Sequence, residues 1–182
     1  AGAGDNSLDG STGNDTASYA LAGAAVVASL TSRTATGGSG NDILQGFENL
    51  LGSNYSDSLI GNTLANKLDG AGGADTLNGG TGADTLTGGS GSDLFYVDNT
   101  GDVVIETGSD ALSGKDSVYA SVSYTLANAF DRRDLAVIGS KRFDLIVDPE
   151  AAAGAGSDAF VLRARVRERP SWRVPAGRAR DR

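Results

Sequence analysis

The sequence predicts an all-β fold built as a solenoid, and three observations support this prediction. A unit of nine residues repeats along much of the chain, glycine is in marked excess, and each unit ends in a triplet with the alternation of a short strand. A fixed period of this kind is the signature of a repeat architecture, in which each unit packs against its neighbours. The chain should therefore wind as loop, strand, loop, strand.

The composition excludes several classes of chemistry. The 182 residues include 27 glycines, about twice the usual share of roughly 7%, but no cysteine and no histidine. Disulfides, thiolate catalysis, zinc-thiolate sites, histidine metal sites and a Ser-His-Asp triad are all excluded. Much of the glycine must instead serve backbone geometry.

Charge divides the chain into two parts. The net charge is −8, from 15 basic and 23 acidic residues, yet residues 1–162 carry −14 and residues 163–182 carry +6. An acidic body argues against nucleic acid as a partner and favours the binding of cations. No apolar run of about 18 residues is present, so we expect no membrane span.

Five copies of the nine-residue unit run without a gap from Gly52 to Tyr96. They are GSNYSDSLI, GNTLANKLD, GAGGADTLN, GGTGADTLT and GGSGSDLFY, and the frame then fades into VDNTGDVVI. An earlier copy, GGSGNDILQ, begins at Gly37 but is out of phase by 15 residues. A degenerate pair, AGAGDNSLD and GSTGNDTAS, opens the chain.

Each position of the unit G-G-x-G-x-D-x-U-x has a physical role, where U is a large apolar residue. Glycines at the first, second and fourth positions permit positive φ and hence a tight turn. The eighth residue should point inward as the middle of a short strand: Leu44, Leu59, Leu68, Leu77, Leu86 and Phe95. The sixth position supplies a carboxylate or amide: Asp42, Asp57, Asn66, Asp75, Asp84, Asp93 and Asp102.

Two consecutive units would make one coil, so each loop should stack on the loop 18 residues later. One edge would then carry the pairs Asp57/Asp75 and Asp75/Asp93, and the other edge would carry Asn66/Asp84 and Asp84/Asp102. Stacked carboxylates repel one another unless a cation lies between them. Ligation by oxygen alone at high coordination number indicates Ca²⁺ rather than Mg²⁺ or a softer metal.

The repeat resembles the RTX (repeats-in-toxin) haemolysin-type calcium-binding nonapeptide, specifically in residues 37–45 and 70–96 and more loosely over residues 1–126. The resemblance implies a right-handed parallel β-roll with several Ca²⁺ ions between its turns. It also implies a bacterial protein secreted to the extracellular space by type I secretion machinery. The aspartates named above would be ligands, helped by carbonyl groups near Gly70, Gly72, Gly79, Thr81, Gly88 and Ser90.

Departures from the pattern rank the expected sites. Tyr55 replaces the fourth glycine in one loop and Asn66 replaces the aspartate in the next, so both loops should bind weakly. Asp75/Asp93 is the strongest expected pair. Asp42 would join the same edge as Asp57 only if residues 46–50 form a shortened return half-turn with Leu50 inward. Asp15 is expected to be structural or unbound, because Ala17 replaces its apolar anchor.

We expect four regions: degenerate repeats in 1–18, a linker with capping strands in 19–36, a calcium-binding roll in 37–126 and an atypical tail in 127–182. Val26, Val27 and Leu30 are expected to cover one end of the roll. Residues 102–106 and 117–126 should form small antiparallel capping strands at the other end. The tail is basic from Arg163 and is expected to be irregular and poorly ordered.

The expected function is that of a non-catalytic module that folds when it binds extracellular calcium. A catalytic pair of carboxylates needs two different environments, whereas these aspartates recur at a structural period, so no enzyme activity is expected in this chain. The parent protein remains open. The module belongs either to a secreted enzyme such as a protease, lipase or polysaccharide epimerase, or to a surface adhesin in which it is a spacer.

Overall fold

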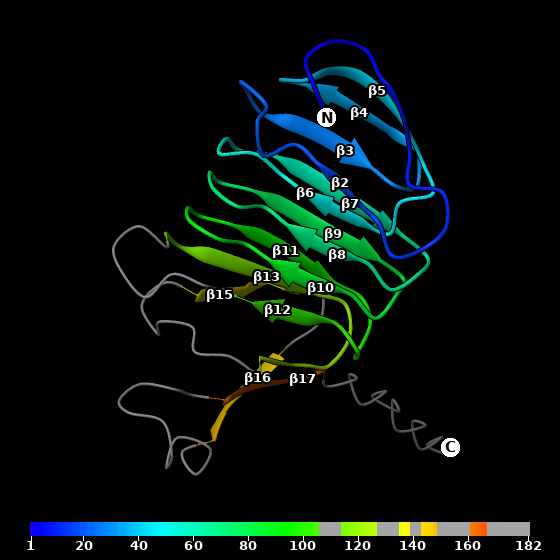
Figure 1. The fold of residues 1–182 in the computed structure, drawn as a ribbon. Helices are drawn as coiled ribbons and strands as arrows, with labels where there is room; N and C mark the ends of the chain where they lie inside the picture. Colours follow the sequence, from blue (N-terminus) through cyan, green and yellow to red (C-terminus); the bar gives the residue numbers. More distant parts are fainter. Residues whose placement is uncertain (106–113, 127–134, 139–142, 149–160, 167–182) are drawn as a thin grey trace, which may run out of the picture.

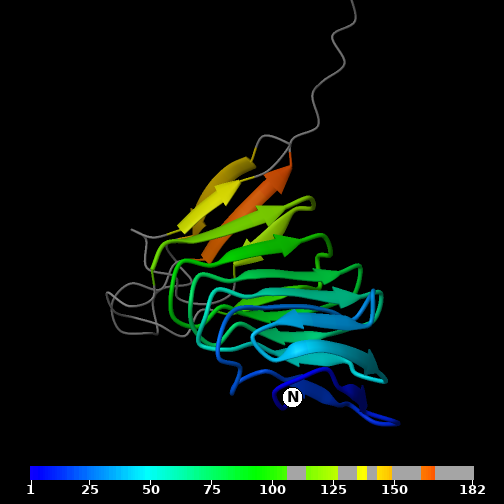
Figure 2. The same cartoon turned by 90° about the horizontal axis from the view of Figure 1, so that it is seen from above.

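The computed structural model describes residues 1–105, 114–126, 135–138, 143–148 and 161–166. Within this part the chain is all-β, and two sheets lie face to face along its length (Figures 1 and 2). Sheet A has nine strands and sheet B has five. Short strands of three to six residues alternate with glycine-rich turns, because each nine-residue unit has one large apolar residue to bury between the sheets.

The strands of sheet A follow one another in the order β1 (Ser7–Asp9), β5 (Gly40–Gln45), β4 (Thr34–Gly37), β3 (Val26–Ser29), β7 (Ser58–Asn62), β9 (Thr76–Gly80), β11 (Leu94–Val97), β13 (Asp116–Ala120) and β15 (Leu135–Ile138). Sheet B has the order β12 (Val103–Ile105), β10 (Thr85–Thr87), β8 (Lys67–Asp69), β6 (Asn49–Leu51) and β2 (Thr16–Ser18).

The register confirms the coil of 18 residues. Leu59 in β7 pairs with Leu77 in β9, and Leu77 pairs with Phe95 in β11. In sheet B, Leu68 pairs with Leu86 in the same parallel manner. Successive coils therefore stack in register, and the fold is a parallel β-roll.

The core lies between the two sheets, and the eighth-position residues form its central column. Their side chains are at most 1% exposed: Leu44, Leu59, Leu68, Leu77, Leu86 and Phe95. Leu50 is equally buried, and its strand β6 lies between β2 and β8, so the shortened return half-turn is confirmed. Side chains alternate across a strand, so the sixth residue of a unit faces the same interior as the eighth.

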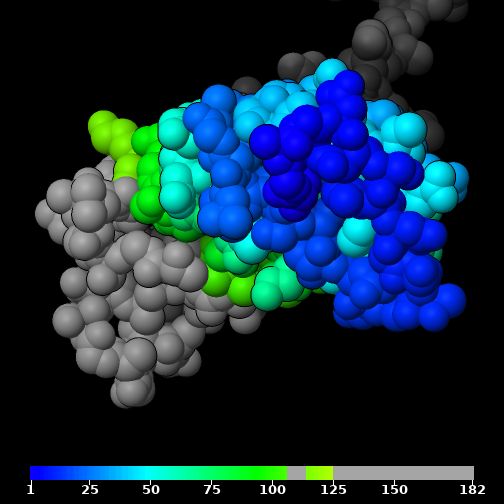
Figure 3. Space-filling view, turned by 45° about the horizontal axis from the view of Figure 1, so that its top comes forward, coloured from blue at the N-terminus to red at the C-terminus, as the bar shows by residue number. Residues whose placement is uncertain are grey.

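An antiparallel insertion interrupts sheet A near its N-terminal end. Strand β4 pairs antiparallel with both β3 and β5, while β3 pairs parallel with β7. The structure thus differs from the expected end cap: residues 26–37 lie inside sheet A, and Val26 and Leu30 are buried in its continuous core. Val27 instead points outward from β3 and is 53% exposed, so it covers no part of the core. The end itself is covered by the N-terminal residues, which are blue in Figure 3.

The expected capping strands after residue 101 are corrected in two ways. Strands β12 and β13 continue the parallel sheets and are not antiparallel. The predicted strand 117–126 breaks at a bend, so that β13 ends at Ala120 and β14 (Tyr124–Leu126) begins a separate sheet. There β14 pairs antiparallel with β17 (Val161–Val166), which also pairs with β16 (Phe143–Asp148).

Strands β15, β16 and β17 were not predicted from the sequence. The rest of the tail, which we expected to be irregular, lies outside the described residues. Among the residues that the structure describes, no helix is long and apolar enough to cross a membrane.

Candidate metal centre

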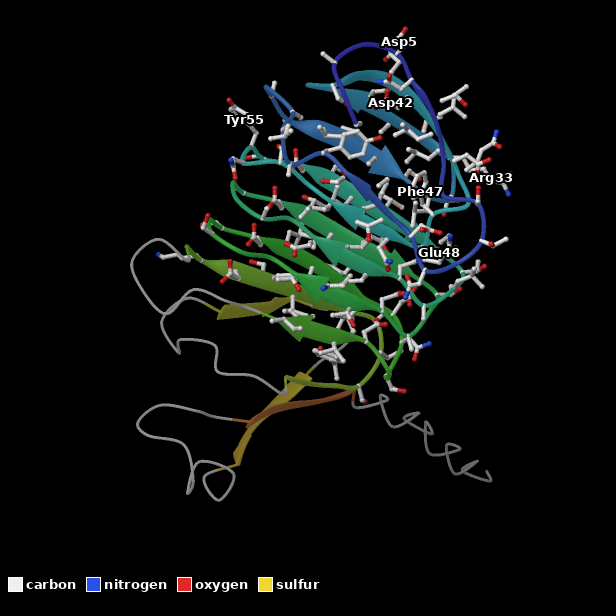
Figure 4. All side chains as sticks on the ribbon, in the orientation of Figure 1. Asp5, Arg33, Asp42, Phe47, Glu48 and Tyr55 are labelled. Carbon is white, nitrogen blue, oxygen red and sulfur yellow. The ribbon has the colours of Figure 1, made fainter. Side chains whose placement is uncertain are left out.

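The sixth residues of the units line the two long edges of the roll. Loops 52–57, 70–75 and 88–93 precede strands of sheet A, and loops 61–66, 79–84 and 97–102 precede strands of sheet B. We call these the sheet A edge and the sheet B edge. In Figure 4 they are marked by Tyr55 and by Glu48, on opposite sides of the roll. All the sixth-position residues of these loops are buried, with side chains at most 6% exposed.

A ladder of hydrogen bonds links each sixth residue to the one 18 positions later. On the sheet A edge, the Asp57 N–H donates to Asp75 Oδ1 at 2.7 Å, and the Asp75 N–H donates to Asp93 Oδ1 at 2.8 Å. On the sheet B edge, the Asp84 Oδ1 accepts from the Asn66 N–H at 2.8 Å, and the Asp84 N–H donates to Asp102 Oδ1 at 3.0 Å. All four predicted stacked pairs are present.

Three of these carboxylates each have one buried oxygen without a partner. The Oδ2 atoms of Asp75, Asp84 and Asp93 make no hydrogen bond and are excluded from solvent. An unpaired buried carboxylate is costly, and burial therefore raises the pKa of Asp75 to about 7 and those of Asp84 and Asp93 to about 6. The backbone hydrogen bond that each accepts lowers its pKa, but less than burial raises it, and the charge of a neighbouring aspartate raises the pKa further.

Glycine provides the space in which the free oxygens of Asp75 and Asp84 lie. A Cβ atom on Gly70 would lie 2.2 Å from Asp75 Oδ2 and 2.8 Å from the carbonyl oxygen of Gly88. A Cβ atom on Gly79 would lie 2.2 Å from Asp84 Oδ2. The carboxylate therefore folds over the first glycine of its own unit, and on the sheet A edge a carbonyl oxygen of the next coil lies beside it.

The donor set of these loops fits calcium. It consists of carboxylate and carbonyl oxygens, the hard ligands that Ca²⁺ prefers, and it offers no nitrogen or sulfur ligand. In the described part of the chain, no three acidic, histidine or cysteine side chains gather as a metal site. A cation here would take one or two carboxylates and complete its shell with backbone carbonyls.

The predicted carbonyl donors divide between the edges as expected. Gly70, Gly72, Gly88 and Ser90 lie on the sheet A edge, where Gly72 and Ser90 are bridged in parallel. The carbonyl of Ser90 accepts the Gly73 N–H at 2.8 Å. On the sheet B edge, where Gly79 and Thr81 lie, the Thr81 carbonyl accepts from Asn99 Nδ2 at 3.3 Å.

Two other aspartates on these two edges differ, because protein donors hold both of their oxygens. Asp102 Oδ2 accepts the backbone N–H groups of Asp98 and Asn99, each at 3.1 Å, beside the ladder bond to Oδ1. Asp57 is held by Val26 and Ser53.

Asn66 is also satisfied without a metal. Its Oδ1 accepts the Asn62 N–H at 2.7 Å, and its Nδ2 donates to the Glu48 carbonyl at 2.7 Å. The amide thus bonds on both sides, as a carboxylate could not.

Asp42 lies on the interior face of β5 but does not stack on Asp57, because β4 and β3 lie between β5 and β7. Its Oδ1 accepts from the backbone N–H and the Nδ2 of Asn6, both at 2.9 Å, and its Oδ2 accepts from Ser39 Oγ at 3.2 Å. Burial and the charge of Asp42 raise the pKa of the buried Tyr19 hydroxyl. Figure 4 shows Asp42 beside Asp5, at the N-terminal end of the roll.

Sequence reasoning missed two members of the ladder. Glu48 stands directly before β6, at the place that the sixth residue of a unit would take, and its Oε2 accepts the Asp15 N–H at 2.9 Å. Asp15 Oδ2 is buried without a partner, although the residue is partly exposed. Asp116 Oδ1 accepts the Asp93 N–H at 2.9 Å. The run Gly114-Lys115-Asp116-Ser117-Val118, which has the fourth to eighth residues of the unit, was the signal for Asp116.

The comparisons with known proteins agree with this geometry. A family model described as the RTX calcium-binding nonapeptide repeat matches in four copies, at residues 1–18, 34–49, 51–86 and 69–104. No curated protein matches the chain significantly.

Proposed function

Because this chain belongs to the RTX calcium-binding nonapeptide repeat family through residues 1–104, we propose that its Ca²⁺ ions bind at the loops of Asp75, Asp84 and Asp93 and drive its folding. One observation carries the choice of these three sites. Each has a carboxylate oxygen that is buried and without a partner, and the oxygens of Asp75 and Asp84 lie over a glycine. The repeats as a family form a structural calcium-binding module.

Without a bound cation, the roll should be unstable relative to the unfolded chain. Folding without a cation buries three carboxylates, each with an unsatisfied oxygen, in a body of net charge −14. The triplet strands bury little apolar surface to offset the ordering entropy of so many glycines. A bound Ca²⁺ supplies the missing positive charge, so binding free energy becomes folding free energy.

We further propose that the module works outside the cell as a non-catalytic part of a type I-secreted bacterial protein. Extracellular calcium modules bind with Kd values of about 10⁻⁴–10⁻³ M, which keeps such a chain unfolded at low cytosolic calcium and folds it outside. The parent protein is then a secreted enzyme or a surface adhesin. A HExxH or GxSxG domain in flanking sequence would favour the enzyme, and many further repeats would favour the adhesin.

Circular dichroism tests the folding proposal directly. The far-UV spectrum should be coil-like in chelator and β-type in millimolar Ca²⁺, while the same concentration of Mg²⁺ should leave it coil-like because Mg²⁺ retains its waters. Identical spectra in chelator and calcium would sink the proposal.

A further inference from the structure

We infer that Ser53 takes the place of a cation at Asp57, so that the coil at this aspartate closes without calcium. The inference deepens the proposed function and rests on it, because it states which of the repeat positions the metal does not fill. It comes from the difference between Asp57 and its equivalents one and two coils later.

Asp57 is surrounded by protein donors. Its Oδ1 accepts the Val26 N–H at 2.7 Å, which is the ladder bond of this coil. The Ser53 hydroxyl lies 2.9 Å from Oδ1 and 3.0 Å from Oδ2, and the Ser53 N–H also donates to Oδ2. Ser53 is fully buried, so no water competes for these bonds.

The equivalent positions in the next two coils have no such donor. Ser53 is the second residue of its unit, and its counterparts are Ala71 and Gly89. Both adopt positive φ, +69° and +105°, whereas Ser53 does not. Neither has a side-chain oxygen, and in their units the Oδ2 atoms of Asp75 and Asp93 remain without a partner. Ser53 therefore differs from them in both side chain and backbone.

The position of Asp57 gives this difference a consequence. Its loop precedes β7, the first strand of the regular roll, and its ladder donor comes from β3 of the antiparallel insertion. On the opposite edge Asn66 is closed by Asn62 and Glu48. Hydrogen bonds thus join the regular roll to the insertion on the sheet A edge and to the half-turn before β6 on the sheet B edge, and the calcium-dependent coils begin after them.

The test is the number of calcium ions bound per chain, measured by isothermal titration calorimetry on the full chain. Ser53→Gly removes the hydroxyl and permits the positive φ of Gly89, so it should bind one more ion than the wild type. The double variant Ser53→Gly/Asp57→Asn should lose that ion again. Ser56→Gly is the matched control: Ser56 is exposed in the same loop, with its hydroxyl on the Ala74 N–H, and its loss should leave the count unchanged.

The single variant Asp57→Asn keeps the inference falsifiable if Ser53→Gly fails to fold. It should bind as many ions as the wild type, and the loss of one ion would overturn the inference. An unchanged count in a folded Ser53→Gly protein would also overturn it. A wild type that binds no calcium would instead refute the proposed function, so the two failures are distinguishable.

Discussion

At the scale of single residues, an aspartate in the sixth position of the unit meets three different environments along one chain. Asp75 has an oxygen without a partner, Asp57 is held by a serine, and Asp102 is held by the backbone of its own loop. The identity of the residue alone therefore does not determine a calcium site. Under the proposed function, the neighbours that reach its second oxygen decide whether a calcium ion binds there.

These environments predict a pH dependence of the metal-free protein. The folded-state pKa values of about 7 for Asp75 and about 6 for Asp93 lie above the ordinary 3.8. Between pH 3.8 and about pH 7 the folded roll binds more protons than the unfolded chain. The stability of the metal-free roll is therefore greatest at low pH and falls as the pH rises through 6 to 7. In chelator, the β-type circular dichroism should be stronger near about pH 5 than near about pH 7.5.

Protons and calcium should also compete at the same oxygens. The calcium concentration at half folding should rise as the pH is lowered from about 7.5 to about 5.5. A midpoint that does not move over this range would contradict the assignment of these carboxylates as ligands.

Substitution should separate the ligands from the other aspartates. Asp75→Ala and Asp93→Ala should each raise the calcium concentration needed for half folding by about tenfold or more, since each removes a proposed buried ligand and a ladder acceptor. Asp15→Ala should have a smaller effect, because its side chain is partly exposed. Calcium titrations followed by circular dichroism compare the three variants, and equal shifts would show that the assigned sites are wrong.

The sequence predicted which sixth-position residues stack on one another. It did not predict which groups bind the second oxygen of each carboxylate. The stacked pairs followed from the 18-residue coil, because identical spacing places identical positions above one another. Ser53 was not singled out, since a serine beside a glycine is an ordinary turn residue. Glu48 was missed because it stands in a half-turn where the nine-residue frame is broken.

At the scale of structural elements, the loops depend on glycines that have no room for a side chain. Gly91 has φ of +123°, and a Cβ atom there would lie 1.9 Å from the carbonyl oxygen of Gly73 in the preceding coil. The stacking of one loop on another thus sets the spacing between coils.

Gly91→Ala should therefore lower the free energy of unfolding in calcium by more than about 1 kcal/mol, because backbone atoms must shift. The melting temperature should fall with it. Gly23→Ala is the control, since a Cβ atom there would meet nothing within 4 Å and should change stability by less than about 0.5 kcal/mol. Thermal unfolding of both variants in millimolar calcium measures the difference. Similar melting temperatures would mean that the loops are not closely stacked.

The strand triplets could be predicted because each follows a glycine-rich loop and has an apolar residue in its middle, as Leu77 and Leu86 illustrate. The insertion could not. The 15-residue offset of Asp42 shows that the frame is interrupted, but it does not show that β3 and β4 enter sheet A between β5 and β7. Alternation in residues 117–126 likewise continued across the bend that separates β13 from β14.

At the scale of the whole molecule, the negative charge of residues 1–162 opposes a compact metal-free state. Residues 1–162 carry −14, which should expand the metal-free chain by self-repulsion, and under the proposed function calcium then neutralises the loops. Small-angle scattering should therefore show a radius of gyration near about 45 Å in chelator, the value for an unfolded chain of this length, and a large decrease in millimolar calcium. An equal radius in both conditions would argue that the roll forms without the metal.

The ladder of N–H groups also gives the roll a direction. The carboxylates of Asp75 and Asp93 each accept hydrogen from the coil that precedes them in the chain. In a chain that emerges with its amino end first, each of these carboxylates finds its donor already formed. Trimming coils from the carboxyl end leaves the remaining carboxylates complete, whereas trimming from the amino end strips the next one of its donor. The two ends of the solenoid are therefore not equivalent, although the repeats between them look alike.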